Sequence, residues 1–209
     1  MKLYTKPGAC STADHIALHW AGIPFEVEIL DNASRKSPEF LALNPAGAVP
    51  VVVDDAAEGG RFVLTQNAAI MGYIADSAPQ AELMGDGSAR QRAEATRWLS
   101  FVNSDLHPSY TPLFAPGLFM RGAEHYDTVK EQARKRVRKH YETVDARLAE
   151  SGGWLAGFRS VADPYLYVTL LWADALGIDT SDLAHVVAFR ARMDADAGVQ
   201  AALKAEGLG

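Results

Sequence analysis

In the first thirty residues the spacing of apolar side chains changes from that of a strand to that of a helix and back again. This pattern restricts the fold more than any other feature of the chain. Residues 1–5 and 25–30 are short runs in which apolar side chains alternate, whereas apolar side chains between residues 13 and 20 repeat at helical spacing. A strand, a helix and a strand in this order predict a βαβ unit with parallel strands and a right-handed crossover.

The following elements extend this unit. Residues 38–43 form a short helical segment, and residues 49–53 are a β-branched run that carries Pro50 near its start. Proline cannot donate a hydrogen bond to a sheet, so Pro50 must open the strand or lie at an edge. After a turn, residues 61–64 return as an antiparallel strand, and residues 65–67 cap a further helix. The predicted order is therefore βαβαββα.

Most of the remaining sequence has helical spacing. The segment of residues 77–88 contains Pro79, Gly85 and Gly87 and has no periodic spacing of apolar residues. We predict an α/β domain at residues 1–80, a linker at residues 81–87 and an all-helical domain at residues 88–209. In the second domain, Ser160 and Asp163 form a capping box before a helix that is apolar nearly all round, which predicts that this helix is buried.

Composition excludes several classes of protein. The chain has 209 residues, of which 48% are hydrophobic and 22% charged, as expected for a folded protein with a full core. Its net charge of −6 argues against nucleic acid as a partner. No apolar run is long enough to cross a membrane, and the N-terminus lacks the pattern of a signal peptide. We expect a cytoplasmic enzyme or binding protein.

The only cysteine, Cys10, lies in the turn Pro-Gly-Ala-Cys-Ser, where the first strand gives way to the first helix. A single cysteine excludes an internal disulfide and fits a reducing compartment. Such a residue is often a small buried hydrophobe, but this polar turn favours a reactive thiol. The positive end of the helix should stabilise a thiolate at Cys10. Ser11 and Asp14 resemble a capping box for the same helix.

Histidine and basic residues suggest fewer functions. His15 and His19 have a spacing that can clip a metal, but no third ligand follows, so we predict a half-exposed pair and no metal site. His107 is either a surface or core residue or part of a site. The basic run at residues 134–139 lies within a predicted helix of an acidic protein, which favours a solvated face over a nucleic-acid site.

Short motifs in a fixed order allow a family comparison. They are Met1-Lys2-Leu3-Tyr4, Lys6-Pro7-Gly8-Ala9-Cys10-Ser11, Asn44-Pro45, Gly47-x-Val49-Pro50, Thr65 to Ile70, Ser104-x-x-His107, Ser160-x-x-Asp163 and Ala205-Glu206-Gly207-Leu208. With the βαβαββα order and the helical second half, they resemble the bacterial beta class of cytosolic glutathione transferases. The resemblance implies a thioredoxin-like domain followed by a helical bundle, assembled as a homodimer.

The resemblance also implies an activity. The expected reaction is conjugation of glutathione to small apolar electrophiles in detoxification, with no metal. Thiol–disulfide exchange through Cys10 and glutathione is a second expected activity. A non-catalytic ligand-binding or stress-related protein of the same fold is the alternative. Phe114, Phe119 and Trp172 would either line the site of the second substrate or pack in the core.

The family pattern implies individual site residues. The catalytic residues would be Cys10, Ser11 and His107. The residues that would contact glutathione are Cys10, Lys36, Val49, Pro50, Gln66, Asn67, Ser104, Asp105, Leu106 and His107. A cis Val49–Pro50 bond would leave the Val49 backbone free to pair with the cysteinyl part of glutathione. The segment from Ser104 to His107 would reach the ligand, partly from the neighbouring subunit.

The two charged ends of glutathione would be held separately. The helix start at Gln66-Asn67 would hold the γ-glutamyl carboxylate, and Lys36 would contact the glycyl carboxylate. Family members usually have an acidic residue at the position of Gln66, which pairs with the γ-glutamyl ammonium. Since glutamine has no charge, we expect weaker glutathione binding here, or partial compensation by Asp105.

Overall fold

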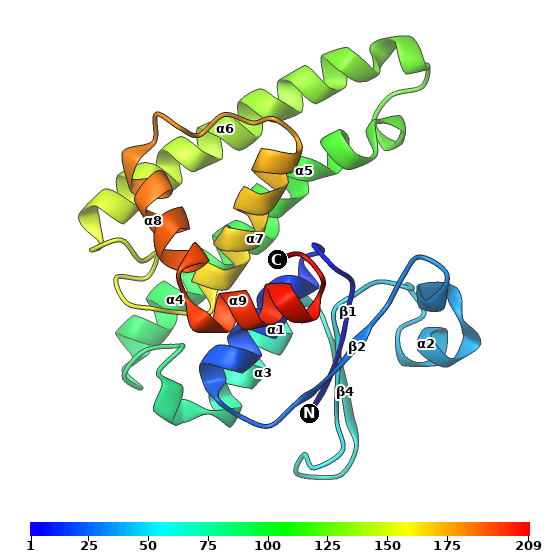
Figure 1. Ribbon diagram of the computed structural model, residues 1–209, viewed down its shortest axis with the longest axis vertical. Helices are drawn as coiled ribbons and strands as arrows, with labels where there is room; N and C mark the ends of the chain where they lie inside the picture. The colour runs from blue at the N-terminus through cyan, green and yellow to red at the C-terminus, as the bar shows by residue number, and fades with distance from the viewer.

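The computed structural model describes residues 1–209, and its N-terminal half has the predicted βαβαββα order (Figure 1). The elements are β1 (Lys2–Thr5), α1 (Ser11–Ala21), β2 (Glu26–Ile29), α2 (Pro38–Leu43), β3 (Val51–Asp54), β4 (Phe62–Thr65) and α3 (Asn67–Ser77). The sheet has the order β2-β1-β3-β4. As predicted, β1 and β2 are parallel, and β3 and β4 form an antiparallel hairpin.

The two faces of the sheet pack against different hydrophobic clusters. Leu3 of β1 lies opposite Val52 of β3, and both side chains are fully buried in the main core, which also contains α1 and α3. A smaller cluster on α2, the strands and the segment after β2 contains Leu30, Phe40, Val51 and Val53. Alternate residues of β3 therefore enter different clusters, as the two-residue repeat of a strand requires.

The second half of the chain is helical. Its helices are α4 (Ala89–Phe101), α5 (His107–Phe114), α6 (Tyr126–Glu150), α7 (Ala162–Ala175), α8 (Ala184–Asp194) and α9 (Ala197–Ala205), with 3-10 turns in the whole chain at Ser34–Lys36, Pro79–Ala81, Pro116–Leu118 and Ala123–His125. A π-helical turn at Val102–Leu106 joins α4 to α5 and was not predicted. Helix α7 is buried along nearly its whole length, which confirms the prediction from its apolar sequence.

One hydrophobic core connects the two halves. A cluster of 45 buried residues includes Leu3, Ile16 and Val52 from the first half and Tyr141 and Phe189 from the second. In Figure 1, α9 at the end of the chain lies across α1, and these two helices are in contact. The backbone N–H of Val161 also donates to the Leu83 carbonyl at 3.0 Å. The shared core fixes the position of α1 relative to the helices.

Of the two capping boxes predicted from the sequence, the one before α7 is observed and the one at α1 is not. The Asp163 carboxylate accepts hydrogen bonds from the backbone N–H of Ser160 at 2.7 Å and of Leu155 at 3.0 Å, which confirms this capping box. At α1 the capping prediction is wrong, because the N-cap residue is Cys10 and no side chain makes a capping hydrogen bond. The Ser11 hydroxyl is instead hydrogen-bonded to the Thr5 hydroxyl, inside the protein.

The remaining predictions concern charged residues and the membrane. Most side chains of the basic run at residues 134–139 are exposed, and Val137 alone is fully buried, as expected for a solvated helix face. The prediction for His15 is wrong: this residue is buried, stacks on His19 and contacts Glu206. None of the helices combines the length and the apolar character needed to cross a lipid bilayer.

Candidate active site

A cavity of about 340 Å³ lies between the sheet unit and the π-helical turn with α5. It is lined by residues from segments far apart in the sequence: the start of α1, the segment before β3, the start of α3, α5 and α7. Six residues of the predicted site line it, and they are Cys10, Val49, Pro50, Gln66, Asn67 and His107.

Main-chain groups fix the position of Cys10 at this cavity. The Cys10 thiol lies 3.7 Å from the carbonyl oxygen of Val49 and donates to it. The Val49–Pro50 peptide bond is cis, as predicted. The side-chain amide of Asn67 donates to the Cys10 carbonyl at 3.0 Å, so the start of α3 is tied to the start of α1. The sulfur, the Val49 carbonyl and the α3 N-terminus therefore meet at one place.

The ionisation of Cys10 differs from the sequence-based expectation. Burial, with a smaller contribution from the nearby Asp14 carboxylate, raises the pKa of the Cys10 thiol to about 12. The amides of the first helical turn favour the thiolate, but their effect is smaller than the cost of burying a charge. The prediction of a stabilised thiolate is therefore wrong for the free protein, in which Cys10 is a neutral thiol.

His107 faces the same cavity with a defined hydrogen-bond partner. Its Nδ1 atom lies 2.5 Å from the Tyr165 hydroxyl, and its ring centroid lies 4.8 Å from that of Trp172. Burial lowers the pKa of His107, so the imidazole is neutral near pH 7. The Tyr165 hydroxyl can donate to Nδ1 or accept from it, and donation to Nδ1 leaves the imidazole proton on Nε2.

The start of α3 is exposed to the cavity at Gln66. This residue is the N-cap of the helix. Its φ of 77° is a backbone angle that residues other than glycine rarely adopt. Its side chain makes no capping hydrogen bond, so the side-chain cap predicted at residues 65–67 is not formed by this N-cap residue. The unpaired N–H groups of the first turn are free to bind an anion.

Several predicted site residues lie elsewhere. Ser11 is fully buried, its hydroxyl is hydrogen-bonded to Thr5 Oγ1 at 2.8 Å and accepts from the Lys6 N–H at 3.2 Å, and it does not line the cavity. This geometry therefore gives no support to its predicted catalytic role. Leu106 is also fully buried, in the hydrophobic core, and does not reach the cavity.

Lys36, Ser104 and Asp105 do not line the cavity of a single chain. Lys36 ends the 3-10 turn before α2. Ser104 and Asp105 are exposed on the π-helical turn, and the Ser104 hydroxyl donates to the Ser100 carbonyl at 2.5 Å. Their exposure contrasts with His107, which is half-buried and lines the cavity. Their contacts to a ligand remain a prediction.

Sequence reasoning missed other residues that line the cavity. Asn103 and Thr111 stand four residues before and after His107, so helical spacing alone would have placed them on its face. Tyr165 gave no such signal, because it belongs to a helix whose sequence is apolar throughout. Further lining residues are Asn44, Thr65 and Pro108.

Behind the cavity, a buried polar network holds the turn that carries Cys10. The Glu206 carboxylate accepts hydrogen bonds from Thr12 Oγ1 at 2.6 Å, from Thr5 Oγ1 at 3.0 Å and from the Gly8 N–H at 3.4 Å. It also contacts His15 Nδ1 at 3.0 Å. The end of the chain therefore fixes the first strand and the first helix.

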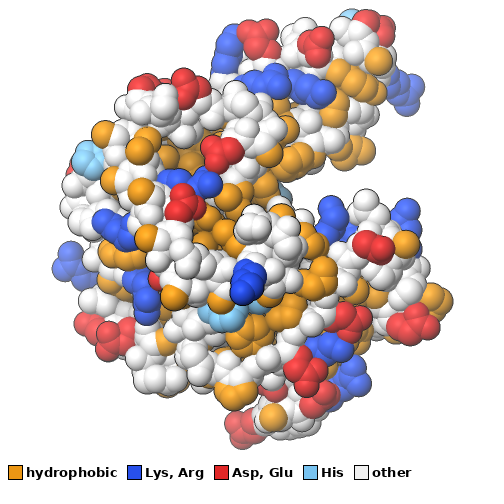
Figure 2. All heavy atoms as spheres, viewed as in Figure 1, with side chains coloured by type: hydrophobic (Ala, Val, Ile, Leu, Met, Phe, Trp, Pro, Cys, Tyr) orange, Lys and Arg blue, Asp and Glu red, His pale blue; other side chains and the backbone are white.

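Aromatic side chains continue from His107 toward the surface. Trp172 donates its indole N–H to the Gly8 carbonyl at 2.7 Å, and its ring centroid lies 5.6 Å from that of Phe114. Phe114 is 54% exposed. Figure 2 shows a deep notch below the arm formed by α5 and α6, with hydrophobic side chains on the arm's side.

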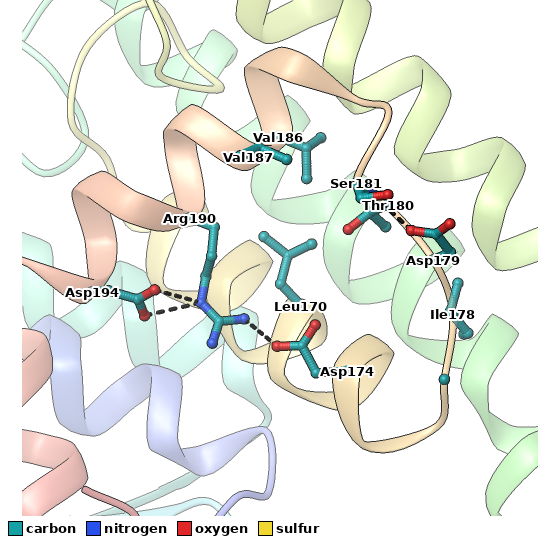
Figure 3. A pocket seen from close by; sticks show the side chains of 11 residues that line it. Leu170, Asp174, Ile178, Asp179, Thr180, Ser181, Val186, Val187, Arg190 and Asp194 are labelled. Atoms are coloured by element: carbon teal, nitrogen blue, oxygen red, sulfur yellow. Dashed lines mark hydrogen bonds and ion pairs between the residues drawn. The ribbon is translucent and has the colours of Figure 1, made fainter.

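Two other cavities lack a cysteine or histidine. One, of about 680 Å³ between α5 and α6, is lined by Phe119, whereas Trp172 does not line it. The other, of about 590 Å³, lies between α7 and α8 (Figure 3). There the Arg190 guanidinium is held between Asp174 at 2.7 Å and Asp194 at 2.9 Å. Since these charges are paired and neither cavity has a thiol or an imidazole, the cavity beside Cys10 is the best candidate.

Family models match both halves of the chain. The model described as "Glutathione S-transferase, N-terminal domain" matches residues 9–77, and the model described as "Glutathione S-transferase, C-terminal domain" matches residues 97–196. The residues that line the cavity all fall within these two ranges.

Similar proteins span the full length of the chain. Glutathione S-transferase GST-4.5 of Xanthomonas campestris is 54% identical over 209 residues, with 100% of both chains covered. The solved glutathione S-transferase of Xylella fastidiosa has a TM-score of 0.92 at 50% identity, covering 100% of this chain and 99% of its own.

Two further structures have 39% identity, with 100% of both chains covered. One is a sphingomonad glutathione S-transferase complexed with glutathione, with a TM-score of 0.85. The other is the bacterial beta-class glutathione S-transferase of Sphingomonas chungbukensis, with a TM-score of 0.84.

Proposed function

Because the chain belongs to the glutathione S-transferase family, we propose that it binds glutathione beside Cys10 and joins the glutathione sulfur to small, apolar electrophiles. The observation that carries this proposal is the meeting of the cis Val49–Pro50 bond, the α3 N-terminus and His107 at one cavity. Similar glutathione S-transferases of full matching length support it, one of them complexed with glutathione. They do not favour the non-catalytic alternative.

The proposed binding mode uses backbone groups. The Val49 main chain pairs with the cysteinyl part of glutathione, and this pairing displaces the Cys10 thiol from the Val49 carbonyl. The N–H groups at the start of α3 hold the γ-glutamyl carboxylate. Gln66 can give the γ-glutamyl ammonium only a neutral hydrogen-bond acceptor, which limits the affinity.

In the proposed reaction, His107 stabilises the sulfur. With Nδ1 bonded to Tyr165, the Nε2–H of the neutral imidazole donates to the glutathione thiolate, whose proton has passed to solvent. The sulfur attacks the electrophilic carbon, a C–S bond forms and the leaving group departs with its electron pair. The rings of Trp172 and Phe114 supply an apolar surface for the electrophile.

Thiol–disulfide exchange through Cys10 is a second candidate activity, supported by the position of its sulfur at the cavity. The Cys10 thiolate would attack a glutathione mixed disulfide, form Cys10–S–S–glutathione and release the other thiol as a thiolate. A second glutathione would then release Cys10 and leave as oxidised glutathione. The high pKa of Cys10 makes the first step slow near pH 7.

Assembly and location follow the family resemblance. We propose a homodimer in which Ser104 and Asp105, both exposed on one chain, contribute to the partner's glutathione site. We also propose that the protein works in the cytoplasm, where its single thiol would stay reduced. Light scattering after gel filtration would measure the mass of the assembly.

Two assays on the purified protein test the proposal. The first measures conjugation of glutathione to an aromatic chloronitro compound, and the second measures glutathione-dependent reduction of a mixed disulfide. We expect His107→Ala to reduce conjugation, and Cys10→Ala to abolish reduction while conjugation persists. Calorimetry would test glutathione binding directly, and a protein that neither binds glutathione nor conjugates it would refute the proposal.

A further inference from the structure

Asp14 is a buried acid that no part of the proposed reaction uses. It lies on α1 one helical turn after Cys10, and its side chain has no exposed surface. Neither of its carboxylate oxygens has a hydrogen-bond partner. Residues four apart on a helix share a face, so Asp14 lies behind Cys10 on the same side of α1.

The titratable and polar groups near Asp14 come from several elements, whereas the Arg159 guanidinium contacts α1 at Trp20, near the end of the helix. Helix α7 brings Tyr165, whose hydroxyl meets His107 of α5, and the segment after α9 brings Glu206. Strand β1 brings Thr5 and helix α3 brings Asn67, which are both neutral. On α1 itself the titratable neighbours are Cys10 and His15.

Glu206 and Asp14 differ in how their charge is compensated. Glu206 accepts hydrogen bonds from two threonine hydroxyls and a backbone N–H and contacts His15. Asp14 has none of these contacts. Burial raises the pKa of an unpaired carboxyl group, and once the group is ionised it interacts strongly with any second negative charge nearby.

We propose that Asp14 is a positioning residue that controls the ionisation of Cys10 and thereby the reactivity of its sulfur. A carboxyl group is the stronger acid of the two, so Asp14 releases its proton first and the thiolate must then form beside an existing negative charge. Asp14 therefore keeps the cysteine protonated, which suppresses chemistry at Cys10 and leaves the cavity to the glutathione sulfur. This inference does not depend on the proposed function, because Cys10 can be titrated without glutathione.

Alkylation of the intact protein by iodoacetamide tests the proposal, because Cys10 is the only thiol. The rate is measured by mass spectrometry between about pH 6 and pH 10. In Asp14→Asn we expect the profile to move to lower pH by about one unit, which is about tenfold faster alkylation at a fixed pH below both midpoints. Asp76→Asn, which removes an exposed carboxylate of α3, serves as the matched control and should leave the profile unchanged.

A second neutral variant separates charge from packing. Asp14→Leu should shift the profile in the same direction as Asp14→Asn, because both variants remove the charge. If Asp14→Asn does not fold, the alkylation profile of Asp14→Leu alone tests whether the charge of Asp14 controls Cys10. An unchanged profile in a folded neutral variant, or shifts of opposite sign in the two variants, would overturn the proposal.

Discussion

The cost of burying Asp14 depends on pH, because apolar surroundings penalise only the ionised carboxylate. Burial raises the pKa of Asp14 well above its ordinary value, and the charge of Glu206 acts in the same direction. A group whose pKa is higher in the folded than in the unfolded protein contributes most to stability below its unfolded pKa. That contribution is lost as the pH rises through the folded pKa.

We therefore expect Asp14→Asn to unfold at a higher urea concentration than the wild type at about pH 8. The gain in unfolding free energy should exceed about 1 kcal/mol, and it should shrink toward about pH 3, where the wild-type carboxyl is mostly protonated in both states. Urea denaturation at several pH values measures this difference. An advantage that is the same at all pH values would show that packing, and not ionisation, is responsible.

Tyr165 acts on the cavity through His107. Tyr165→Phe removes the hydroxyl that lies 2.5 Å from His107 Nδ1, so the imidazole loses the contact that fixes its tautomer. We expect kcat/KM for conjugation to fall about fivefold to tenfold, with little change in the KM for glutathione. Tyr167→Phe is a matched control on the same helix, because its hydroxyl bonds to Asp194 away from the cavity. Equal losses in the two variants would argue against a role for Tyr165 at His107.

At the scale of elements, the start of α3 should limit glutathione affinity. Gln66→Glu places a carboxylate at this rim, where it can pair with the γ-glutamyl ammonium. We expect calorimetry to show about tenfold tighter glutathione binding, since a charge-assisted hydrogen bond is worth about 1 kcal/mol more than a neutral one. Gln200→Glu on α9 is an exposed control that should have no effect. Unchanged affinity in Gln66→Glu would mean that the ammonium lies elsewhere.

Element order was predictable from sequence, whereas the details of the site were less so. Alternation and helical spacing identified the βαβαββα unit, and the family motif around Val49-Pro50 identified the cis bond. The π-helical turn at Val102–Leu106 has no periodic signal, since it inserts into an otherwise regular helix. Its rotation decides that Asn103 and His107 face the cavity while Ser104 and Asp105 face outward.

The errors at α1 come from long-range contacts. Ser11 lies next to a helix start in the sequence, but its hydroxyl bonds to Thr5 in the interior. The pKa of Cys10 was misjudged because the sequence indicates the helix terminus and not the depth of burial. Glu206 could not be paired with the first helix from sequence, since 191 positions separate it from His15.

Across the whole molecule, Glu206 connects the end of the chain to its beginning. Glu206→Ala leaves the hydroxyls of Thr5 and Thr12 and the ring of His15 without their shared partner in a buried place. We expect the unfolding free energy to fall by about 3–5 kcal/mol, measured by urea denaturation. Glu150→Ala, at the exposed end of α6, is the control and should change it by less than about 0.5 kcal/mol. A similarly small change in Glu206→Ala would mean that the end of the chain holds α1 only through apolar packing.

The core that runs from β1 to α8 limits how this protein can be recombined with its relatives. A chimera that takes its sheet from one homologue and its helices from another must match side chains across a seam formed by α1, α7 and α9. The acid at residue 206 and its hydroxyl partners at residues 5 and 12 would have to be inherited together. Successful exchange between homologues should therefore depend less on where the crossover is placed than on whether both parents share this set of residues.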